Sequence, residues 1–465
     1  MPDLHVVVLA AGKGTRMKSA VPKVLHEAAG LSLIERVLRT TAPLEPASII
    51  VVVGYQASQI QEALGKRLGL AFALQEPQLG TGHALLQAEP MLADARGTLV
   101  LLSGDVPLLR PETVERLIRT HEERAAAATI LTAVLSDADG YGRVVRSAGE
   151  IASIVEHKDA SPAEREIREI NSGIYAFDLA PLFAALRTIG SSNAQREYYL
   201  PDLVKIYRGR GLKVETVRLD DPREILGVNS RKELADVATI LRSEKNDELM
   251  AAGVTLVDPA TAYIDPDVTI GPDTIIHPGV FLEGKTTIGS RCEIHSGVRL
   301  VNSSVDDGAI LHNFCVIIDS HVGKGAQLGP FAHLRPQSHV GEEAKVGNFV
   351  ELKNADVAEG AKVNHLSYVG DASVGAKANI GAGTITCNYD GFGKYRTEIG
   401  AGAFIGSNTA LVAPVKVGDG AIVGAGSVIT RDVEADSLAV ERSEQKGIAG
   451  WARRFRERMT RKAAE

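Results

Sequence analysis

Two groups of residues in this chain have the types and spacing that chemistry on phosphates requires. The first lies near the N-terminus, where the glycines of residues 12–14 directly follow the apolar run of residues 6–9. A glycine loop after a strand lets the backbone approach a ligand, and its amides form a nest for an anion. The cations Arg16 and Lys23 come just downstream. The string does not fit the GxxxxGK[ST] pattern of a P-loop, and for the glycines alone a plain turn is the favoured interpretation.

A carboxylate, Asp105, follows the apolar run of residues 98–102. In an open α/β sheet, this position lies at the edge where ligands bind. A carboxylate combined with a neutral amide oxygen, such as that of Asn229, suits a hard ion like Mg²⁺ that keeps several waters. Without further context, Asp105 is a turn residue before Pro107, and Asn229 is a loop or cap residue.

The second group comprises Arg335, Lys353 and His365. Arg335 and Lys353 are 18 residues apart, which is three times the six-residue period of this part of the chain. In a parallel β-coil they stack on adjacent turns at a strand spacing of about 4.8 Å, where like charges repel unless an anion lies between them. Two screened surface cations that splay apart are an equally good interpretation. We expect all three side chains to line one outer wall and to form a pocket for an anion such as a sugar phosphate.

A hexapeptide repeat provides the elements for this second group. Aliphatic residues recur every six positions, and the small residue four later (Val268, Thr274) fits the same narrow interior. The period predicts a prism of parallel β-coils, because an α-helix cannot use a period of six. Residues 386–398 break the repeat and are expected to form a projecting loop. The repeat positions are Ile264, Ile270, Ile276, Leu282, Ile288, Ile294, Leu300, then Leu328, Leu334, Val340, Val346, Leu352, and then Ile399, Ile405, Leu411, Val417, Val423 and Ile429.

The first half of the chain has a different pattern. Short β-branched runs alternate with helical patterns up to about residue 230, which predicts an α/β domain with a parallel sheet. Residues 232–250 are free of proline and carry helically spaced apolar side chains, so they predict one helix. We therefore predict an α/β domain at 1–231, a helical linker at 232–252 and a β-helix domain with a basic tail at 253–465.

Composition limits the class of protein. The chain has 465 residues, 45% of them hydrophobic and 23% charged, and a net charge of −7, which gives no general attraction to nucleic acid. No segment reaches the roughly 18 unbroken apolar residues of a membrane span, and no basic region precedes the first apolar run, so we expect a cytoplasmic protein without membrane insertion. The three cysteines, Cys292, Cys315 and Cys387, are expected to be reduced thiols.

Taken together, the motifs resemble those of the bifunctional N-acetylglucosamine-1-phosphate uridylyltransferase/glucosamine-1-phosphate acetyltransferase family. The resemblance spans nearly the whole chain and implies a Rossmann-like nucleotidyltransferase domain joined to a left-handed parallel β-helix. In the first half it rests on Leu79-Gly80-Thr81-Gly82, Gly104-Asp105-Val106-Pro107, Gly140-Tyr141-Gly142-Arg143, Val155-Glu156-His157-Lys158 and Ile170-Asn171-Ser172-Gly173. In the second half it rests on Asn364-His365-Leu366-Ser367-Tyr368 and Thr386-Cys387-Asn388-Tyr389-Asp390-Gly391.

The resemblance implies roles for individual residues of the first half. Magnesium would be held by Asp105 and Asn229, while Arg16 and Lys23 would provide positive charge to the reacting phosphates. Ser103 departs from the family, whose familiar members carry an aromatic residue two positions before this aspartate. The implied nucleotide and sugar contacts are Leu9, Ala10, Ala11, Gly12, Lys23, Gln75, Gly80, Thr81, Ser103, Gly104, Asp105, Gly142, Glu156, Asn171 and Asn229.

For the second half, the resemblance implies that His365 is the general base of acetyl transfer. An amine that attacks a thioester must lose a proton, and a neutral imidazole can accept it near pH 7. The implied sugar-phosphate contacts are Arg335, Lys353, Tyr368 and Asn379, and the implied acetyl-CoA contacts are Ala382, Asn388, Tyr389, Ser407, Ala425 and Arg442. Cys387 is interpreted as packing beside the coenzyme.

The expected function is therefore the acetylation of glucosamine 1-phosphate by acetyl-CoA, followed by transfer of uridylyl from UTP to N-acetylglucosamine 1-phosphate, which yields UDP-N-acetylglucosamine. The alternative is a sugar-nucleotide pyrophosphorylase whose β-helix only assembles or regulates it. A non-catalytic sensor would not need Asp105 and Asn229. The resemblance also implies a homotrimer.

A histidine pair raises the question of a second metal. His277 and His295 are 18 residues apart, as a metal ladder requires, and His333 and His339 are six apart. Because no carboxylate or cysteine completes either set in the sequence pattern, we expect no metal there.

Overall fold

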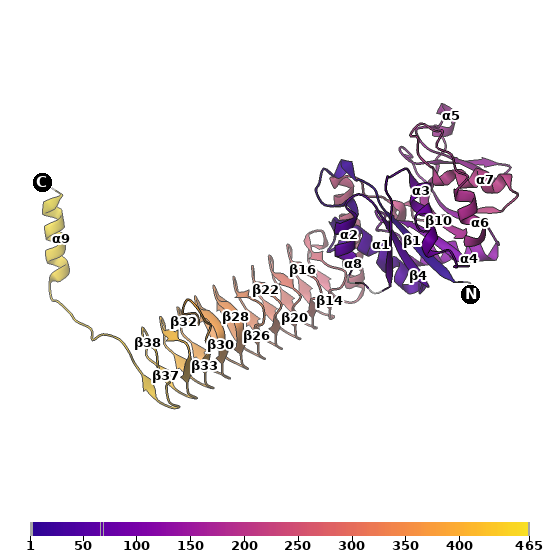
Figure 1. The fold of residues 1–465 in the computed structure, drawn as a ribbon. Coiled ribbons are helices and arrows are strands. Elements are labelled where there is room, and N and C mark those ends of the chain that lie inside the picture. The colour runs from indigo at the N-terminus through magenta and orange to yellow at the C-terminus, as the bar shows by residue number, and fades with distance from the viewer. Residues whose placement is uncertain (1–2, 66, 68, 464–465) are drawn as a thin grey trace. The chain divides into compact units, whose positions relative to one another are not determined.

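A computed structural model describes residues 3–65, 67 and 69–463 and divides the chain into two compact units, residues 1–244 and 245–465 (Figure 1). Each unit has its own buried core. Within the described residues, no helix combines the length and the apolar character that crossing a membrane requires.

The first unit is built on a nine-stranded sheet with the strand order β11-β7-β10-β6-β1-β4-β5, and β8 and β9 extend from β10. β1 pairs in parallel with β4 and β6, and its interior residues Val6, Val7 and Val8 are fully buried, as expected for a central strand covered on both faces. The strands are β1 Leu4–Ala10, β4 Ser48–Val53, β5 Leu70–Leu74, β6 Thr98–Ser103, β7 Ala128–Val134, β8 Arg143–Ser147, β9 Glu150–Val155, β10 Glu169–Asp178 and β11 Val214–Arg218.

Helices connect these strands, as the alternating sequence pattern predicts. They are α1 Leu33–Thr41, α2 Ala57–Leu64, α3 Thr81–Leu86, α4 Pro111–Glu123, α5 Pro162–Arg165, α6 Leu179–Leu186 and α7 Leu203–Gly209. The carboxyl ends of the parallel strands β1 and β6 lie side by side, because Leu9 is in register with Ser103. The glycine loop and Asp105 therefore emerge at the same edge of the sheet.

The helix α8, Arg231–Ala251, agrees with the helix predicted for residues 232–250. Near its start, Val237 is buried in a cluster with Met17 and Leu33 of the first unit. Near its end, Leu249 belongs to the core of the second unit, where the Asn246 side chain donates hydrogen bonds to backbone oxygens of the first coil.

The second unit is a left-handed parallel β-helix with three short strands in each coil, shown as a column of stacked strands in Figure 1. An 11-stranded sheet from β12 (Thr255–Leu256) to β39 (Leu438–Ala439) forms one wall. A 17-stranded sheet from β13 (Tyr263–Ile264) to β38 (Val428–Ile429) forms the other two. One coil, for example, contains β15 Ile275–Ile276, β16 Phe281–Glu283 and β17 Thr287–Ile288.

The predicted inward positions of the hexapeptide repeat are confirmed. Every aliphatic residue named for the repeat is at most 9% exposed, and Val268 and Thr274 are fully buried. The corner residues with positive φ include Phe314, Phe331 and many polar residues as well as glycines. Those corners accept the strained conformation because stacking between coils fixes the backbone on both sides.

The predicted loop at residues 386–398 is too wide at both ends. β32 runs Ile385–Cys387 and β33 runs Thr397–Ile399, so the insertion spans residues 388–396. Thr386 is buried at an inward position where the repeat usually has an aliphatic residue, and Thr397 is buried at the small-residue position two before Ile399. The hydroxyl of Thr386 donates to the backbone oxygen of Gly370, which is how a polar side chain is accepted there.

Substitution of an inward residue tests the packing of the coil. Ile288→Ala should lower the free energy of unfolding by about 2–5 kcal/mol, because the rigid coils cannot close the cavity that it leaves. The neighbouring Thr287 points outward and is exposed, so Thr287→Ala should change the stability by less than about 0.5 kcal/mol. Urea denaturation followed by circular dichroism measures both, and equal losses for the two variants would contradict the inward assignment.

Candidate active sites

The predicted uridine contacts of the first unit line a single cavity of about 490 Å³. Two lysines, Lys13 and Lys23, share this lining with the carboxylates Asp105 and Glu197, so the cavity presents both signs of charge. Arg16 lies in the short 3-10 helix Thr15–Met17, is exposed and is not part of this lining. The predicted residues in the lining are Leu9, Ala10, Ala11, Gly12, Lys23, Gln75, Gly80, Thr81, Ser103 and Asp105.

Gln75 is held rigidly at this cavity. Its side chain is only 3% exposed, and its amide nitrogen donates to the backbone oxygen of Gly80 at 3.0 Å and lies 3.2 Å from Nδ1 of His83. A side chain at Gly80 would collide with the backbone of Tyr198, so a glycine is required at this close approach. An amide fixed in this way can read the edge of a base, and the motif around Gly80 alone did not reveal the contribution of His83.

The predicted magnesium ligands lie together, with a cation between them. The ammonium of Lys23 donates to Oδ1 of Asn229 at 3.0 Å and forms an ion pair with Asp105. Asn229 comes from the segment before α8. The backbone amide of Val228 donates to the backbone oxygen of Asp105 at 2.9 Å, and this bond holds the two segments together. Two oxygen ligands that converge on a positive charge fit the requirements of a hard divalent ion.

The predicted sugar contacts form a second cluster beside β8, β9 and β10. The backbone amide of Asn171 donates to the oxygen of Gly142 at 2.9 Å, and a Cβ on Gly142 would lie 3.3 Å from the carboxylate of Glu156. Ser103 lies on the neighbouring strand with its hydroxyl facing Gly173. Glu156 lines a cavity of about 290 Å³ that is distinct from the one described above.

In the second unit, Arg335 and Lys353 stack on adjacent coils as predicted. β25 (His333–Leu334) pairs with β28 (Glu351–Val357) with Leu334 opposite Leu352, and the amide of Arg335 donates to the oxygen of Leu352 at 2.9 Å. Arg335 also forms an ion pair of 3.0 Å with Glu351, which the 18-residue spacing did not reveal. This contact offsets one of the two charges.

Lys394 adds a third cation to this place, from the insertion at residues 388–396. It lies beside Lys353 and lowers the pKa of that ammonium, and Arg335 makes a smaller contribution in the same direction. Three cations that meet in this way repel one another, so the charge favours a bound anion. Lys394 could not be found from the repeat because it lies outside the period.

The expectation that His365 shares a wall with Arg335 and Lys353 is wrong. His365 ends β29 (Lys362–His365), which belongs to the 11-stranded sheet. In contrast, Lys353 lies within β28 of the 17-stranded sheet, and Arg335 directly follows β25 of that sheet. Twelve residues separate Lys353 from His365, which is two strands of a three-strand coil rather than a whole coil. Leu366 then turns the corner with a φ of 48°, and Tyr368 begins β30 (Tyr368–Val374) opposite Glu351. The imidazole therefore lies at the edge of its own wall, next to the wall that carries Arg335 and Lys353.

The imidazole of His365 is oriented by Asn348 of the preceding coil. The two residues are in register, and Nδ1 lies 2.7 Å from Oδ1 of Asn348. Since a carbonyl oxygen only accepts, the proton of a neutral ring lies on Nδ1, and Nε2 is left with a free electron pair. This arrangement is what a general base requires, and the 17-residue spacing of the pair is the signal that could have identified Asn348.

The remaining predicted sugar-phosphate contacts also lie on two walls. Tyr368 lies over Gly370, since a Cβ there would collide with the phenol ring and its oxygen. Asn379 begins β31 (Asn379–Ile380) in the same sheet as His365.

The predicted acetyl-CoA contacts stack along one corner of later coils. The amide of Asn408 donates to the oxygen of Ala382, the amide of Gly426 donates to the oxygen of Ser407, and Nη1 of Arg442 donates to the oxygen of Ala425 at 2.6 Å. The column therefore joins four predicted residues, Ala382, Ser407, Ala425 and Arg442. Asn388 is buried and bonds to Asp371 at the base of the insertion, while Tyr389 is 61% exposed.

Three family models match parts of the chain. The MobA-like NTP transferase domain matches residues 6–170, and the bacterial transferase hexapeptide with six repeats matches residues 396–431. The model of the GMPPB C-terminal domain matches residues 263–338. The fold and these matches define the class of protein as a transferase that combines a nucleotidyltransferase domain with a hexapeptide β-helix.

Full-length relatives identify the family. The chain is 50% identical to the bifunctional protein GlmU of Brevibacillus brevis, with 98% of each chain covered. It is 49% identical to the bifunctional protein GlmU of Exiguobacterium sp., with 97% of this chain and 100% of the relative covered. It is also 49% identical to that of Koribacter versatilis, with 98% of each covered. The chain therefore belongs to the GlmU family of bifunctional proteins, which confirms the resemblance found in the sequence.

Among solved structures, the chain matches a putative glucose-1-phosphate thymidylyltransferase from Bacillus anthracis in complex with a sucrose. The match covers 51% of this chain and 94% of that one. Its identity is 17% and its TM-score is 0.42, which is too low to support an argument.

The carboxyl of Glu156 should make stability depend on pH. Burial, with a smaller contribution from Asp159, raises the pKa of Glu156 above its usual value of about 4.3. The folded state then binds a proton more tightly than the unfolded state, so the stability from this group is present below about pH 4 and is lost as the pH rises through the raised pKa. Glu156→Gln should therefore unfold at a higher temperature than the wild type at pH 7.5, with a difference that shrinks toward pH 4.

Scanning calorimetry at the two pH values measures this difference, and Glu166→Gln, which removes an exposed carboxylate from the same unit, is the charge-matched control. A Glu156 variant that is less stable than the wild type at pH 7.5 would contradict the raised pKa.

Proposed function

We infer that the chain catalyses two reactions at separate sites. Acetyl-CoA acetylates the amine of glucosamine 1-phosphate and releases free thiol, and UTP then transfers uridylyl to N-acetylglucosamine 1-phosphate and releases pyrophosphate. The observation that carries this function is the similarity to bifunctional GlmU proteins, at 50% and 49% identity over 98% and 97% of the chain. We assign the uridylyl transfer to residues 1–231 and the acetyl transfer to residues 253–465, with residues 232–252 as the linker.

For the uridylyl transfer, we propose that the cavity at Gly12, Gln75 and Thr81 binds UTP and that Gly142, Glu156 and Asn171 bind the sugar. Joining a sugar phosphate to the α-phosphorus brings two anions together, so positive charge must surround the attacking and leaving oxygens. Bound at Asp105 and Asn229, Mg²⁺ would neutralise charge on the phosphates. The ammonium of Lys23, now held by those two ligands, would then be released to contact phosphate, and the exposed Arg16 can close on the ligand.

For the acetyl transfer, we propose that the three cations Arg335, Lys353 and Lys394 bind the sugar phosphate. The free Nε2 of His365 takes a proton from the amine as it attacks the thioester, and Asn348 keeps the imidazole in the required tautomer. Because His365 stands on a neighbouring wall, the sugar must bridge the corner formed by residues 366–367. The column of Ala382, Ser407, Ala425 and Arg442, with Asn388 and Tyr389 from the insertion, would hold acetyl-CoA.

The alternative is a single pyrophosphorylase activity with a β-helix that only assembles the protein. The oriented imidazole and the three clustered cations favour two activities, because assembly alone requires neither. Incubation with glucosamine 1-phosphate, acetyl-CoA, UTP and Mg²⁺ distinguishes the two functions. Two activities release both thiol and pyrophosphate, whereas the alternative predicts no thiol and requires supplied N-acetylglucosamine 1-phosphate for pyrophosphate release.

Two substitutions should separate the activities. His365→Ala removes the base and should reduce thiol release by at least about 10²-fold, with uridylylation of supplied N-acetylglucosamine 1-phosphate unchanged. Asp105→Ala should abolish pyrophosphate release and leave thiol release intact. Both products are measured for each folded variant, and His339→Ala, which removes another exposed imidazole of the β-helix, is the control for His365. Loss of both activities in either variant would contradict independent sites.

We also propose that the chain is cytoplasmic and assembles as a homotrimer through its β-helix. An exposed ladder of stacked rings, Phe314, Phe331 and Phe349, with centroids 5.2 Å apart, supports an apolar contact surface. Sedimentation equilibrium should give the mass of three chains, and a monomer at micromolar concentration would overturn the trimer without affecting the two activities.

A further inference from the structure

Three side chains of types that can ligate a metal meet on the early coils of the β-helix, about two coils before Arg335. His277 follows β15, while Glu293 begins β18 (Glu293–Ile294) and His295 follows it on the next coil. The sequence-based expectation that no carboxylate completes this histidine pair is therefore wrong. The sequence pattern does not show this contact because Glu293 precedes its own inward residue Ile294, and the coil turns its side chain outward to lie beside both rings.

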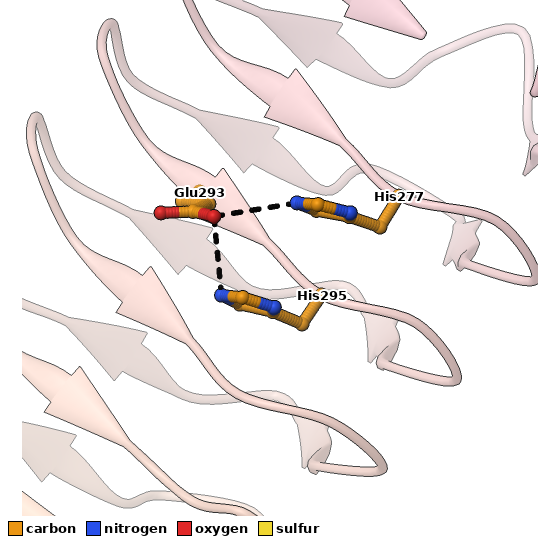
Figure 2. A group of neighbouring side chains, drawn as sticks. All are labelled: His277, Glu293 and His295. Atoms are coloured by element: carbon orange, nitrogen blue, oxygen red, sulfur yellow. Dashed lines mark hydrogen bonds and ion pairs between the residues drawn. The ribbon is translucent and has the colours of Figure 1, made fainter. Parts of the chain in front are cut away.

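The three side chains converge on one point, as Figure 2 shows. The same carboxylate oxygen, Oε1 of Glu293, lies 3.3 Å from Nε2 of His277 and 3.3 Å from Nε2 of His295. The two rings are stacked with centroids 4.7 Å apart and an interplanar angle of 3°. Within residues 3–65, 67 and 69–463, this is the one group of three histidine, cysteine or acidic residues whose ligand atoms all lie within 4.8 Å of one another.

These distances suit a small transition-metal ion. Zinc binds imidazole nitrogen and carboxylate oxygen at about 2.0–2.2 Å, so neighbouring ligand atoms of a tetrahedral site lie about 3.3–3.5 Å apart. The two distances to Glu293 already meet this value. The distance between Nε2 of His277 and Nε2 of His295 shortens when the partly exposed rings tilt toward each other. Magnesium and calcium prefer sites made of oxygen, so two imidazoles select against them.

The surroundings leave the three side chains accessible from solvent. His312 lies on the following coil with its ring tilted by 36° from that of His295. All three ligands are 25–40% exposed, so an ion can enter from solvent, and the fourth position of a tetrahedral site remains open to water.

We propose that His277, Glu293 and His295 bind a divalent transition-metal ion of the zinc class. The ion bonds to side chains from two consecutive coils and fastens them together. Its role is structural, because Arg335 lies about two coils further along the column, at roughly 18 residues per coil. The proposal does not depend on the two assigned activities.

The test is zinc binding by the full-length chain. Equilibrium dialysis with Zn²⁺ alone as the probe is done with excess Mg²⁺, so that the proposed magnesium site does not contribute. The wild type should bind about one Zn²⁺ per chain. Each of the variants His277→Gln, Glu293→Gln and His295→Gln should bind at least about 10-fold more weakly.

A second histidine pair provides the matched control. His321 and His339 also lie on adjacent coils, but their ring centroids are 6.3 Å apart, and they are not part of the cluster of three. The variant His339→Gln should therefore bind Zn²⁺ as the wild type does. Co²⁺ provides a spectroscopic check, because the visible absorption of a tetrahedral Co²⁺ site should appear in the wild type and in His339→Gln only.

Three results would overturn the proposal: no binding by the wild type, wild-type affinity in the three ligand variants, or equal loss in His339→Gln. Far-UV circular dichroism and urea denaturation verify that the β-helix of each variant is folded. Because three separate substitutions remove a ligand, failure of one variant to fold leaves the other two to decide.

Discussion

The narrow interior of the β-helix is the constraint on which the second unit depends. Most strands turn an aliphatic residue inward, and such a residue returns every fifth or sixth position, as at Leu300, Val305 and Leu311. Stacking of identical positions then fixes the register between coils, as with Leu334 opposite Leu352. A side chain outside the prism is therefore placed by its distance in sequence from the inward residue. In this unit, the side chains proposed to bind substrates form columns along the coils, whereas most folds carry their binding sites on loops.

Columns and corners also limit which residues can meet. Residues one coil apart, about 17–18 positions, lie above one another, and the pairs Arg335 with Lys353 and Asn348 with His365 both follow this rule. Residues 12 positions apart lie on different walls, which is why Lys353 and His365 are separated by a corner. A pocket for a small substrate therefore needs either a corner or an insertion, and this chain has both at residues 365–368 and 388–396.

Much of this architecture could be predicted from the sequence because it follows from periodicity. The inward residues, the helix at Arg231–Ala251 and the α/β character of the first unit are all local patterns. Glu351, Lys394 and Glu293 were not predicted, because their contacts depend on side-chain direction or on an insertion that no period governs. Likewise, the contact of Lys23 with Asp105 joins positions 82 residues apart. Topology brings such residues together, and only the family resemblance indicated it beforehand.

Both proposed sites bring together groups of like charge. Lys353 and Lys394 repel each other, and Glu156 is a half-buried carboxyl beside other carboxylates. Neither arrangement stabilises the fold, since replacing one charge would relieve the repulsion or the desolvation. In the first cavity, by contrast, Lys23 satisfies Asp105 and Asn229 until a ligand arrives. Under the proposed function, the same ammonium would pair with the two proposed magnesium ligands before substrate binds and would contact phosphate afterwards, so that the Asp105 carboxylate is paired at both stages.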